Sequence, residues 1–362
     1  MAVAIGIGRF VYTPILPPMI AELRFGTLTA GVVASANFAG YLAGALMISR
    51  LSLPGPPTAW LTGSLLASAV TTAAMGLTDA VAGFIVLRFL GGVASALALI
   101  LSSALVLDRI ARAGRPALGA LHFSGVGLGI AVSATLVAVL SGFGLAWPAR
   151  WWGSGALSVV GALAVPWLIP AGVAGPAPSA AVSHAASSPT LRRMTIVYGL
   201  FGFGYVITAT FLVAIVRDTP SIRALEPVIW VVVGLAAAPS VAFWTWLGRR
   251  FGTKTAFALA AITEAAGVLA SVTPLGMGAL CASGVLLGGT FMGLTALGLI
   301  RARELATGDP RRAIAAMTAS FGIGQILGPA VAGFVSDATG GFALASILAA
   351  AGLIIAAWLA RR

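Results

Sequence analysis

Arg9 opens a short polar stripe in an otherwise apolar stretch of the chain. Tyr12 and Thr13 follow it at i+3 and i+4, which places the three side chains on one face of a helix. A guanidinium beside hydroxyl groups suits an anionic ligand, because the planar fork of arginine binds carboxylate or phosphate through two hydrogen bonds. The alternative is that Arg9 extends its charged head to a nearby aqueous boundary. We expect Arg9 and Tyr12 to contact a ligand.

Arg88 is a second arginine inside an apolar stretch, and Gly91 and Gly92 follow it. A charge in apolar surroundings is costly and is therefore a candidate for function. Arg88 could bind an anion or assist proton transfer, or it could donate hydrogen bonds to backbone carbonyls of neighbouring helices. We expect a ligand contact at Arg88 as well.

Other polar side chains in apolar stretches could complete a binding site. His122 could relay protons, because its unperturbed pKa lies near neutrality, or it could pack as a neutral side chain between helices. Asn37, Tyr205 and Gln325 could hydrogen-bond a ligand, although polar side chains also join helices to one another. Glu264 is the one acid deep in an apolar stretch, and we expect it to face away from the ligand, either paired or protonated.

No soluble catalytic or cofactor motif accompanies these residues. The sequence contains no Walker loop, no HExxH and no GxSxG motif. A single cysteine, Cys281, and two histidines cannot build a Cys/His metal site or an internal disulfide framework. We therefore expect neither enzymatic activity nor a cofactor or metal centre.

The composition identifies the environment of these side chains. Of the 362 residues, 59% are hydrophobic and 8% are charged, whereas soluble domains are about 45–50% apolar and about 25% charged. So few charges cannot cover a water-facing surface, which excludes a soluble enzyme, a nucleic-acid-binding domain and a disordered chain. The formal net charge of +12 comes from arginines in short connections, as in membrane proteins.

Twelve apolar runs have the length that a helix needs to cross a bilayer, about 20 residues. They are too long for barrel strands and lack period-two alternation. The expected fold class is an all-α polytopic membrane protein with twelve transmembrane helices. The predicted spans are residues 2–23, 28–49, 56–77, 80–107, 117–141, 147–169, 194–216, 225–247, 254–273, 276–299, 313–336 and 341–360.

Basic residues in the connections predict the orientation of the chain. With the N-terminus inside, fifteen Lys and Arg residues fall in inner connections and the C-terminal tail, and four fall in outer connections. This bias places both termini in the cytoplasm, with the chain in the inner (plasma) membrane.

The chain divides into two halves. The stretch 170–193 is rich in Pro, Ala and Ser, and we interpret it as a flexible cytoplasmic linker between residues 1–169 and 194–362, with six spans each. Glycine-rich segments recur between the halves at offsets of 196 to 198 residues; one pair is Leu90-Gly91-Gly92 and Leu287-Gly288-Gly289. This recurrence indicates duplication. Two six-helix bundles with a site between them are typical of transporters.

Three segments resemble the major facilitator superfamily, and the resemblance covers essentially the whole chain. It implies two six-helix bundles and a gating role for Arg250, Gly252 and Lys254. One position departs from the family pattern, because Arg249 stands where the family has an Asp. The segments are Arg88-Phe89-Leu90-Gly91-Gly92, like the fourth helix of the family; Gly125-Val126-Gly127-Leu128-Gly129, like its fifth helix; and Gly248-Arg249-Arg250-Phe251-Gly252-Thr253-Lys254, like its basic loop.

A narrower resemblance is to the YbfB/YjiJ-type subfamily. Membership implies secondary transport and does not define a substrate. The matching segments are Gly6-Ile7-Gly8-Arg9-Phe10-Val11-Tyr12-Thr13-Pro14, Ala34-Ser35-Ala36-Asn37, His122-Phe123-Ser124-Gly125-Val126-Gly127 and Ser320-Phe321-Gly322-Ile323-Gly324-Gln325.

The expected function is secondary active transport by alternating access, with proton coupling if His122 relays protons. Arg9 and Arg88 favour a small organic anion as the substrate, because the expected cavity spans carry no deep acid. Two alternatives remain: drug-type efflux of apolar compounds, and a membrane sensor or assembly protein that does not transport. The expected partners are the substrate, protons and the lipid bilayer, without nucleic acid, and the oligomeric state stays open.

Overall fold

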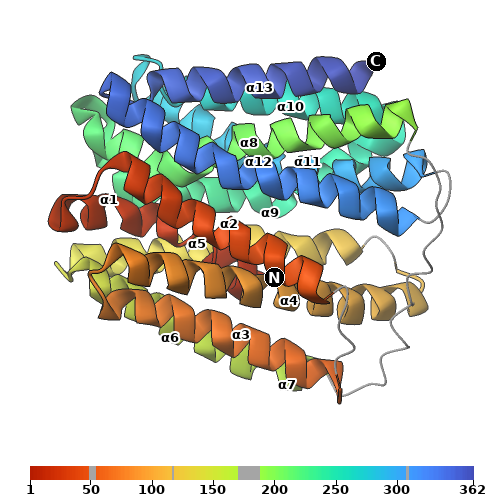
Figure 1. The fold of residues 1–362 in the computed structure, drawn as a ribbon, viewed down its shortest axis with the longest axis horizontal. Coiled ribbons are helices and arrows are strands. Elements are labelled where there is room, and N and C mark those ends of the chain that lie inside the picture. Colours follow the sequence, from red (N-terminus) through yellow and green to blue (C-terminus); the bar gives the residue numbers. More distant parts are fainter. Residues whose placement is uncertain (49–53, 116–117, 170–187, 307–309) are drawn as a thin grey trace.

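The computed structural model describes residues 1–48, 54–115, 118–169, 188–306 and 310–362. Within these ranges, twelve helices are long and apolar enough to cross a membrane. Figure 1 shows them packed side by side, and the described part of the chain contains no strand. The predicted all-α class with twelve spans is confirmed.

The helices form two groups, which occupy the lower and upper parts of Figure 1. The N-terminal half contains η1 (Ala2–Ile7), α1 (Tyr12–Leu23), α2 (Thr27–Ile48), α3 (Pro57–Ala74), η2 (Met75–Leu77), α4 (Val81–Arg112), α5 (Gly119–Gly142), α6 (Trp147–Leu163) and α7 (Val165–Leu168). The C-terminal half contains α8 (Pro189–Asp218), η4 (Pro220–Leu225), α9 (Glu226–Phe251), α10 (Thr253–Ala270), α11 (Gly276–Leu305), α12 (Pro310–Thr339) and α13 (Ala343–Arg361).

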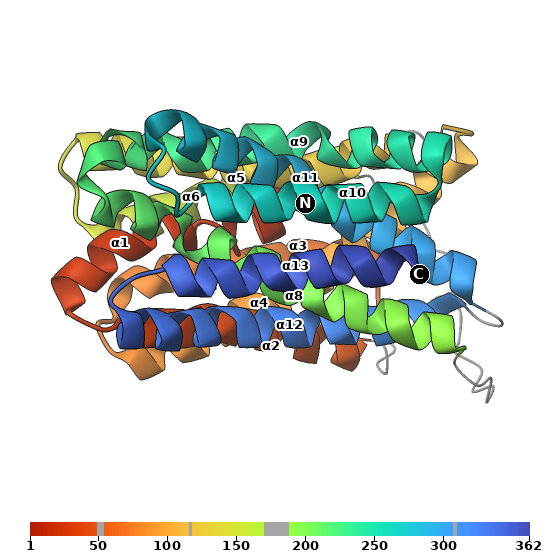
Figure 2. The same ribbon diagram turned by 90° about the horizontal axis from the view of Figure 1, so that it is seen from above.

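Two names describe the ends of the bundle below. The linker end is the end at which α7 stops and α8 begins, and the far end is the one that holds the turn between α1 and α2. The halves pack together where α2 lies beside α12 and where α5 lies beside α9, on opposite sides of the molecule (Figure 2).

Glycines allow helices within each half to cross at backbone contact. A Cβ atom on Gly92 of α4 would lie 2.1 Å from the carbonyl oxygen of Asn37 on α2. A Cβ atom on Gly288 of α11 would lie 2.2 Å from the carbonyl oxygen of Val233 on α9. Gly288 and Val233 each follow their counterparts by 196 residues, so this helix crossing recurs at the offset of the sequence repeat.

Several helices extend beyond the predicted apolar spans. The fourth continues to Arg112, five residues past the prediction, and α8 begins at Pro189, inside the predicted linker. Ser188 caps α8 by accepting a hydrogen bond from the backbone N–H of Leu191 at 3.2 Å. Hydropathy identifies only the part of a helix that lies in hydrocarbon, while backbone hydrogen bonding continues into water. Residues 170–187 of the predicted linker lie outside the described residues.

Candidate functional site

The first predicted span is interrupted, and Arg88 stabilises the interruption. The π-helical η1 and the α-helix α1 are separated by a turn that includes Gly8 and Arg9. The guanidinium of Arg88 donates from Nη1 to the carbonyl of Gly8 at 3.0 Å and from Nη2 to the carbonyl of Arg9 at 3.1 Å. Non-helical backbone is tolerated at membrane depth when its polar groups are satisfied in this way. The predicted span over residues 2–23 is a single candidate membrane segment, and this turn divides it into η1 and α1.

Proline explains where the interruption occurs. Pro14 has no N–H to offer to the carbonyl of Phe10, four residues earlier. That carbonyl instead accepts hydrogen bonds from the backbone N–H of Thr13 at 3.3 Å and from Nε1 of Trp230 on α9 at 3.1 Å. The turn thus presents carbonyls to both halves of the protein, to Arg88 from the N-terminal half and to Trp230 from the C-terminal half.

Tyr12 and Asn37 donate hydrogen bonds to backbone carbonyls of neighbouring helices. The Tyr12 hydroxyl donates to the carbonyl of Ala30 at 2.9 Å, and the Arg88 guanidinium carbon lies 4.9 Å from the centre of the Tyr12 ring. Asn37 Nδ2 donates to the carbonyl of Arg88 at 3.0 Å. Arg88, Tyr12 and Asn37 were expected to contact a ligand. That contact stays a prediction: the three side chains donate to backbone carbonyls here, while Arg88 Nε and Asn37 Oδ1 have no hydrogen-bond partner.

Arg9 has a different environment. It is 7% exposed, and its guanidinium carbon lies 4.3 Å from the ring centre of Tyr41 and 5.3 Å from that of Phe38. Its Nε and Nη2 atoms are buried and have no hydrogen-bond partner. No carboxylate of the described residues forms an ion pair with it. Arg9 is therefore a buried cation in an aromatic surrounding with unused donors.

Tyr205 and Gln325 face this region from the C-terminal half. The Gln325 amide nitrogen donates to the Tyr205 hydroxyl, while its Oε1 atom is buried without a partner. Phe10, the residue next to Arg9, contacts Phe291, and Phe291 stacks on Tyr205 across the boundary between the halves. We call Arg9, Tyr41, Tyr205 and Gln325 the central cluster.

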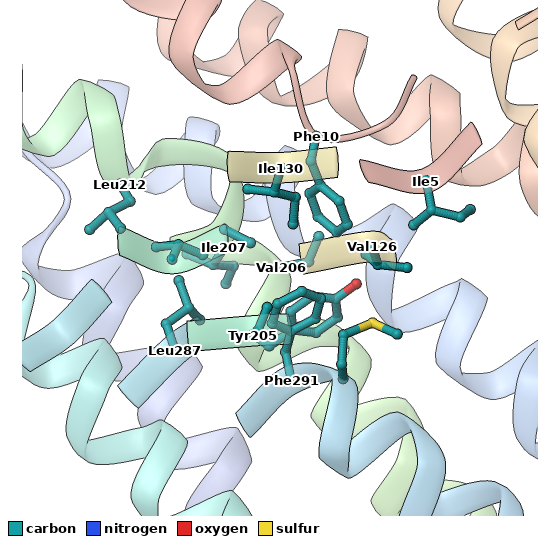
Figure 3. Close-up of a cluster of buried hydrophobic side chains, with 14 of the residues drawn as sticks. Ile5, Phe10, Val126, Ile130, Tyr205, Val206, Ile207, Leu212, Leu287 and Phe291 are labelled. Atoms are coloured by element: carbon teal, nitrogen blue, oxygen red, sulfur yellow. The ribbon is translucent and has the colours of Figure 1, made fainter. Parts of the chain in front are cut away.

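Aromatic rings surround the central cluster on the side of the C-terminal half. Tyr205 stacks on Phe291 at 5.7 Å and on Phe321 at 5.8 Å between ring centres. Phe10 contacts Phe291 edge to face at 5.7 Å, which joins the halves (Figure 3). The cluster therefore combines one positive charge, two phenols and an amide with an apolar lining.

Two hydrogen bonds that join the halves lie on the far side of the central cluster. Thr13 of α1 donates to the carbonyl of Ala209 at 2.7 Å, and Ser35 of α2 donates to the carbonyl of Ile326 at 2.6 Å. Along α8 and α12, Tyr205 and Gln325 come before Ala209 and Ile326 when counted from the linker end. The cluster thus lies on the linker side of this closed contact. Opening from the linker end would expose it without breaking these bonds.

His122 occupies the first turns of α5, close to the linker end. Its ring is partly exposed and contacts the ring of Phe123 at 5.3 Å, and its Nε2 atom has no hydrogen-bond partner. No described contact links His122 to the central cluster. The structure therefore places it apart from Arg9, near the start of its helix.

The predicted gating loop lies at the linker end between α9 and α10. Gly252 has a φ of +86°, a conformation that favours glycine. The neighbouring Thr253 hydroxyl donates to Glu304 of α11 at 2.6 Å, and Glu304 also pairs with Arg301 at 2.8 Å. Arg250 lies over the Phe251 ring, and Lys254 stands in the first turn of α10. A gating role for Arg250, Gly252 and Lys254 stays a prediction.

Tyr41 and Phe38 were not predicted as site residues. They are one helical turn apart on α2, so their rings can both meet the Arg9 guanidinium. The available signal was an aromatic pair at i+3 in an apolar run. That pattern is also typical of ordinary packing, and only the position of Arg9 distinguishes the two.

Known proteins resemble the chain over its full length. The profile of the family described as "Uncharacterised MFS-type transporter YbfB" matches residues 1–361. A chloramphenicol resistance protein of Streptomyces lividans is 26% identical over 381 residues, which cover 98% of this chain and 92% of that protein.

Solved transporter structures share the fold. The crystal structure of the nucleoside transporter NupG has 17% sequence identity and a TM-score of 0.68, with 99% of this chain and 97% of that chain covered. A bacterial homologue of the human lysosomal transporter Spinster, in an inward-facing and occupied conformation, has 15% identity and a TM-score of 0.74, with 99% and 93% covered. The chain is a non-enzymatic secondary transporter of the major facilitator superfamily, and it belongs to the YbfB family of MFS-type transporters.

Proposed function

We propose that the protein transports a small organic anion with an apolar or aromatic body, and that Arg9 is its main contact. The observation that carries this proposal is the buried Arg9 guanidinium with two unpartnered nitrogen atoms and no acidic partner among the described residues. A buried charge without a counterion is costly. An anionic ligand would supply the missing counterion, and the guanidinium fork suits a carboxylate.

The surroundings of Arg9 narrow the ligand class. Tyr41 and Phe38 flank the guanidinium, and the stacked rings of Tyr205 and Phe321 lie on the opposite half. Such surfaces favour a flat apolar group next to the carboxylate. The free Oε1 of Gln325 can accept a hydrogen bond from a hydroxyl or amino group of the same ligand.

The test uses three ligands of one shape and different charge: benzoate, benzamide and benzamidine. Purified protein is heated with each ligand, and the shift in unfolding temperature reports binding. Benzoate should stabilise the wild-type protein most, and the Arg9→Gln variant should lose this shift. Arg112→Gln is the matched control, because Arg112 is exposed at the linker end and pairs with Asp108. A larger shift with benzamidine than with benzoate would contradict the proposal.

A second candidate function is efflux of neutral apolar compounds. The named relative from Streptomyces lividans is a chloramphenicol resistance protein, and the aromatic lining of the central cluster also suits an uncharged ring. Chloramphenicol joins the three ligands in the same assay. A chloramphenicol shift that exceeds the benzoate shift and survives Arg9→Gln would favour this second function.

We further propose alternating access through the linker end, with the termini in the cytoplasm and proton coupling. The position of the central cluster on the linker side of the bonds between the halves supports access from that end. His122, partly exposed near that end, is a proposed entry relay for protons.

A further inference from the structure

Glu264 is a buried acid that forms no stabilising polar contact among the described residues. It lies in the middle of α10, is 0% exposed, and neither carboxyl oxygen has a hydrogen-bond partner. No ion pair of the described residues includes it. An isolated carboxylate in apolar surroundings is so unfavourable that the group takes up a proton instead. The geometry therefore corresponds to a neutral carboxylic acid.

The neighbouring Thr290 suits a protonated Glu264. This hydroxyl faces Glu264 from α11, and it donates its hydrogen to the carbonyl of Leu286 in its own helix at 2.6 Å. A hydroxyl that has already donated can still accept. Thr290 can therefore accept a hydrogen bond from a protonated Glu264.

No charged residue on the helices around α10 lies near the depth of Glu264. Those helices are α8, α9, α11 and α13. Their other titratable side chains inside the bundle are Tyr198 and Tyr205 on α8 and Cys281 on α11. Their charged residues all stand in terminal turns, namely Arg192, Arg193, Arg217, Asp218, Glu226, Arg249, Arg250, Arg301, Arg303, Glu304 and Arg361.

Tyr205 connects Glu264 to the central cluster. Glu264 lies two helical turns from Phe257, on the same face of α10. The Phe257 ring contacts Phe201 edge to face at 6.3 Å, and Phe201 stacks on Tyr205 at 5.1 Å between ring centres. Tyr205 also holds Gln325 by a hydrogen bond. A charge that appears on Glu264 therefore acts on the same region that would hold the ligand.

We propose that Glu264 binds the coupling proton, and that proton and anion bind together because the two negative charges compete for the field of Arg9. This inference rests on the proposed function. With Glu264 neutral, Arg9 is available to the substrate anion. With Glu264 ionised, the carboxylate repels that anion across Tyr205. Linkage then requires that anion binding favours protonation of Glu264 and that protonation favours anion binding, so both cross the membrane in the same direction.

The first test needs no ligand. Infrared difference spectra of the purified wild-type protein and the Glu264→Gln variant at neutral pH should contain the C=O stretching band of a protonated carboxylic acid. Ordinary carboxyl groups have ionised at neutral pH, so the exposed control Glu22→Gln should give no such band. Absence of the band from the Glu264→Gln difference spectrum would overturn the proposal. Presence of the band supports the proton site even if Glu264→Gln lowers stability.

The second test examines coupling with benzoate as the probe. Benzoate affinity of the wild-type and Glu22→Gln proteins should fall as pH rises, whereas the affinity of Glu264→Gln should be independent of pH. Wild-type pH dependence in Glu264→Gln would overturn the coupling. Failure of benzoate to bind the wild-type protein at any pH would refute the proposed function together with the coupling. The infrared band would then still decide whether Glu264 holds a proton.

Discussion

The carboxylate of Asp337, at the end of α12, caps the first turn of α2 by accepting a hydrogen bond from the backbone N–H of Thr27 at 3.0 Å. Its second oxygen accepts from the N–H of Leu28 at 2.9 Å, and the Thr27 hydroxyl bonds both Asp337 and the carbonyl of Gly333. A helix of one half is therefore capped by a side chain of the other. Because the N-terminus of a helix favours a negative charge, this cap stabilises the closed far end.

Removal of the cap should open the far end. Asp337→Ala should weaken the contact between the halves by about 1 kcal/mol, the usual contribution of a helix cap. The fraction of molecules that are open at the far end should then rise roughly fivefold. Spin labels on Glu22→Cys and Leu344→Cys, in a Cys281→Ser background, measure the opening as a distance distribution. Asp79→Ala, an exposed acid in another connection at the same end, is the control and should leave the distribution unchanged.

Arg88 should matter for stability. Hydrogen bonds to charged groups are worth about 1.5–3 kcal/mol each, so Arg88→Gln should lower the free energy of unfolding by roughly 3 kcal/mol. Arg88→Lys can keep one carbonyl partner and should lose about half as much. Thermal unfolding in detergent measures both, against Arg112→Gln on the same helix. A loss no larger than that of the control would mean that the turn does not depend on these bonds.

Arg9 should show the opposite behaviour. Replacement of a buried charge that has no partner is neutral or stabilising, so Arg9→Gln should unfold at an equal or higher temperature than the wild type without ligand. The same variant should lose benzoate binding, and Arg9→Lys should retain part of it, because a point charge replaces a bidentate fork. A clear loss of stability in ligand-free Arg9→Gln would indicate that Arg9 is a structural residue like Arg88.

The orientation of the chain can be tested with reporter fusions. The excess of basic residues in one set of connections predicts that reporters after Arg362 and within residues 176–190 are cytoplasmic. Fusions near Gly142 and Asp218 should be external. A fluorescent protein and alkaline phosphatase, which are active on opposite sides of the membrane, report the two cases. An external reporter after Arg362 would contradict the predicted orientation.

His122 should influence the pH dependence of transport if it admits protons from the linker end. His122→Gln should flatten the pH profile of the transport rate between about pH 5 and 8, the range in which histidine changes charge. The assay is uptake of labelled benzoate into proteoliposomes. A pH profile identical to that of the wild type would mean that His122 only packs against Phe123 and does not relay protons.

The sequence by itself determined the membrane class, the twelve spans and the family. These depend on composition, run length and local motifs, which are properties of neighbouring residues. It also identified Arg9, Arg88 and Glu264 as buried charges, because few charges occur in such apolar runs. It did not determine the helix ends, because α4 and α8 continue beyond the apolar runs.

Only the tertiary structure decided which of the two arginines binds backbone carbonyls. Arg9 and Arg88 each lie in an apolar run, and the sequence around them does not distinguish their roles. Arg88 meets two carbonyls that lie about 80 residues earlier, at a turn whose existence depends on Pro14 and on packing across the halves. Arg9 meets the rings of Phe38 and Tyr41 on α2 instead, and its Nε and Nη2 atoms have no hydrogen-bond partner. Whether a buried donor is satisfied depends on groups brought near by long-range folding, and the spacing of residues along the chain carries no information about them.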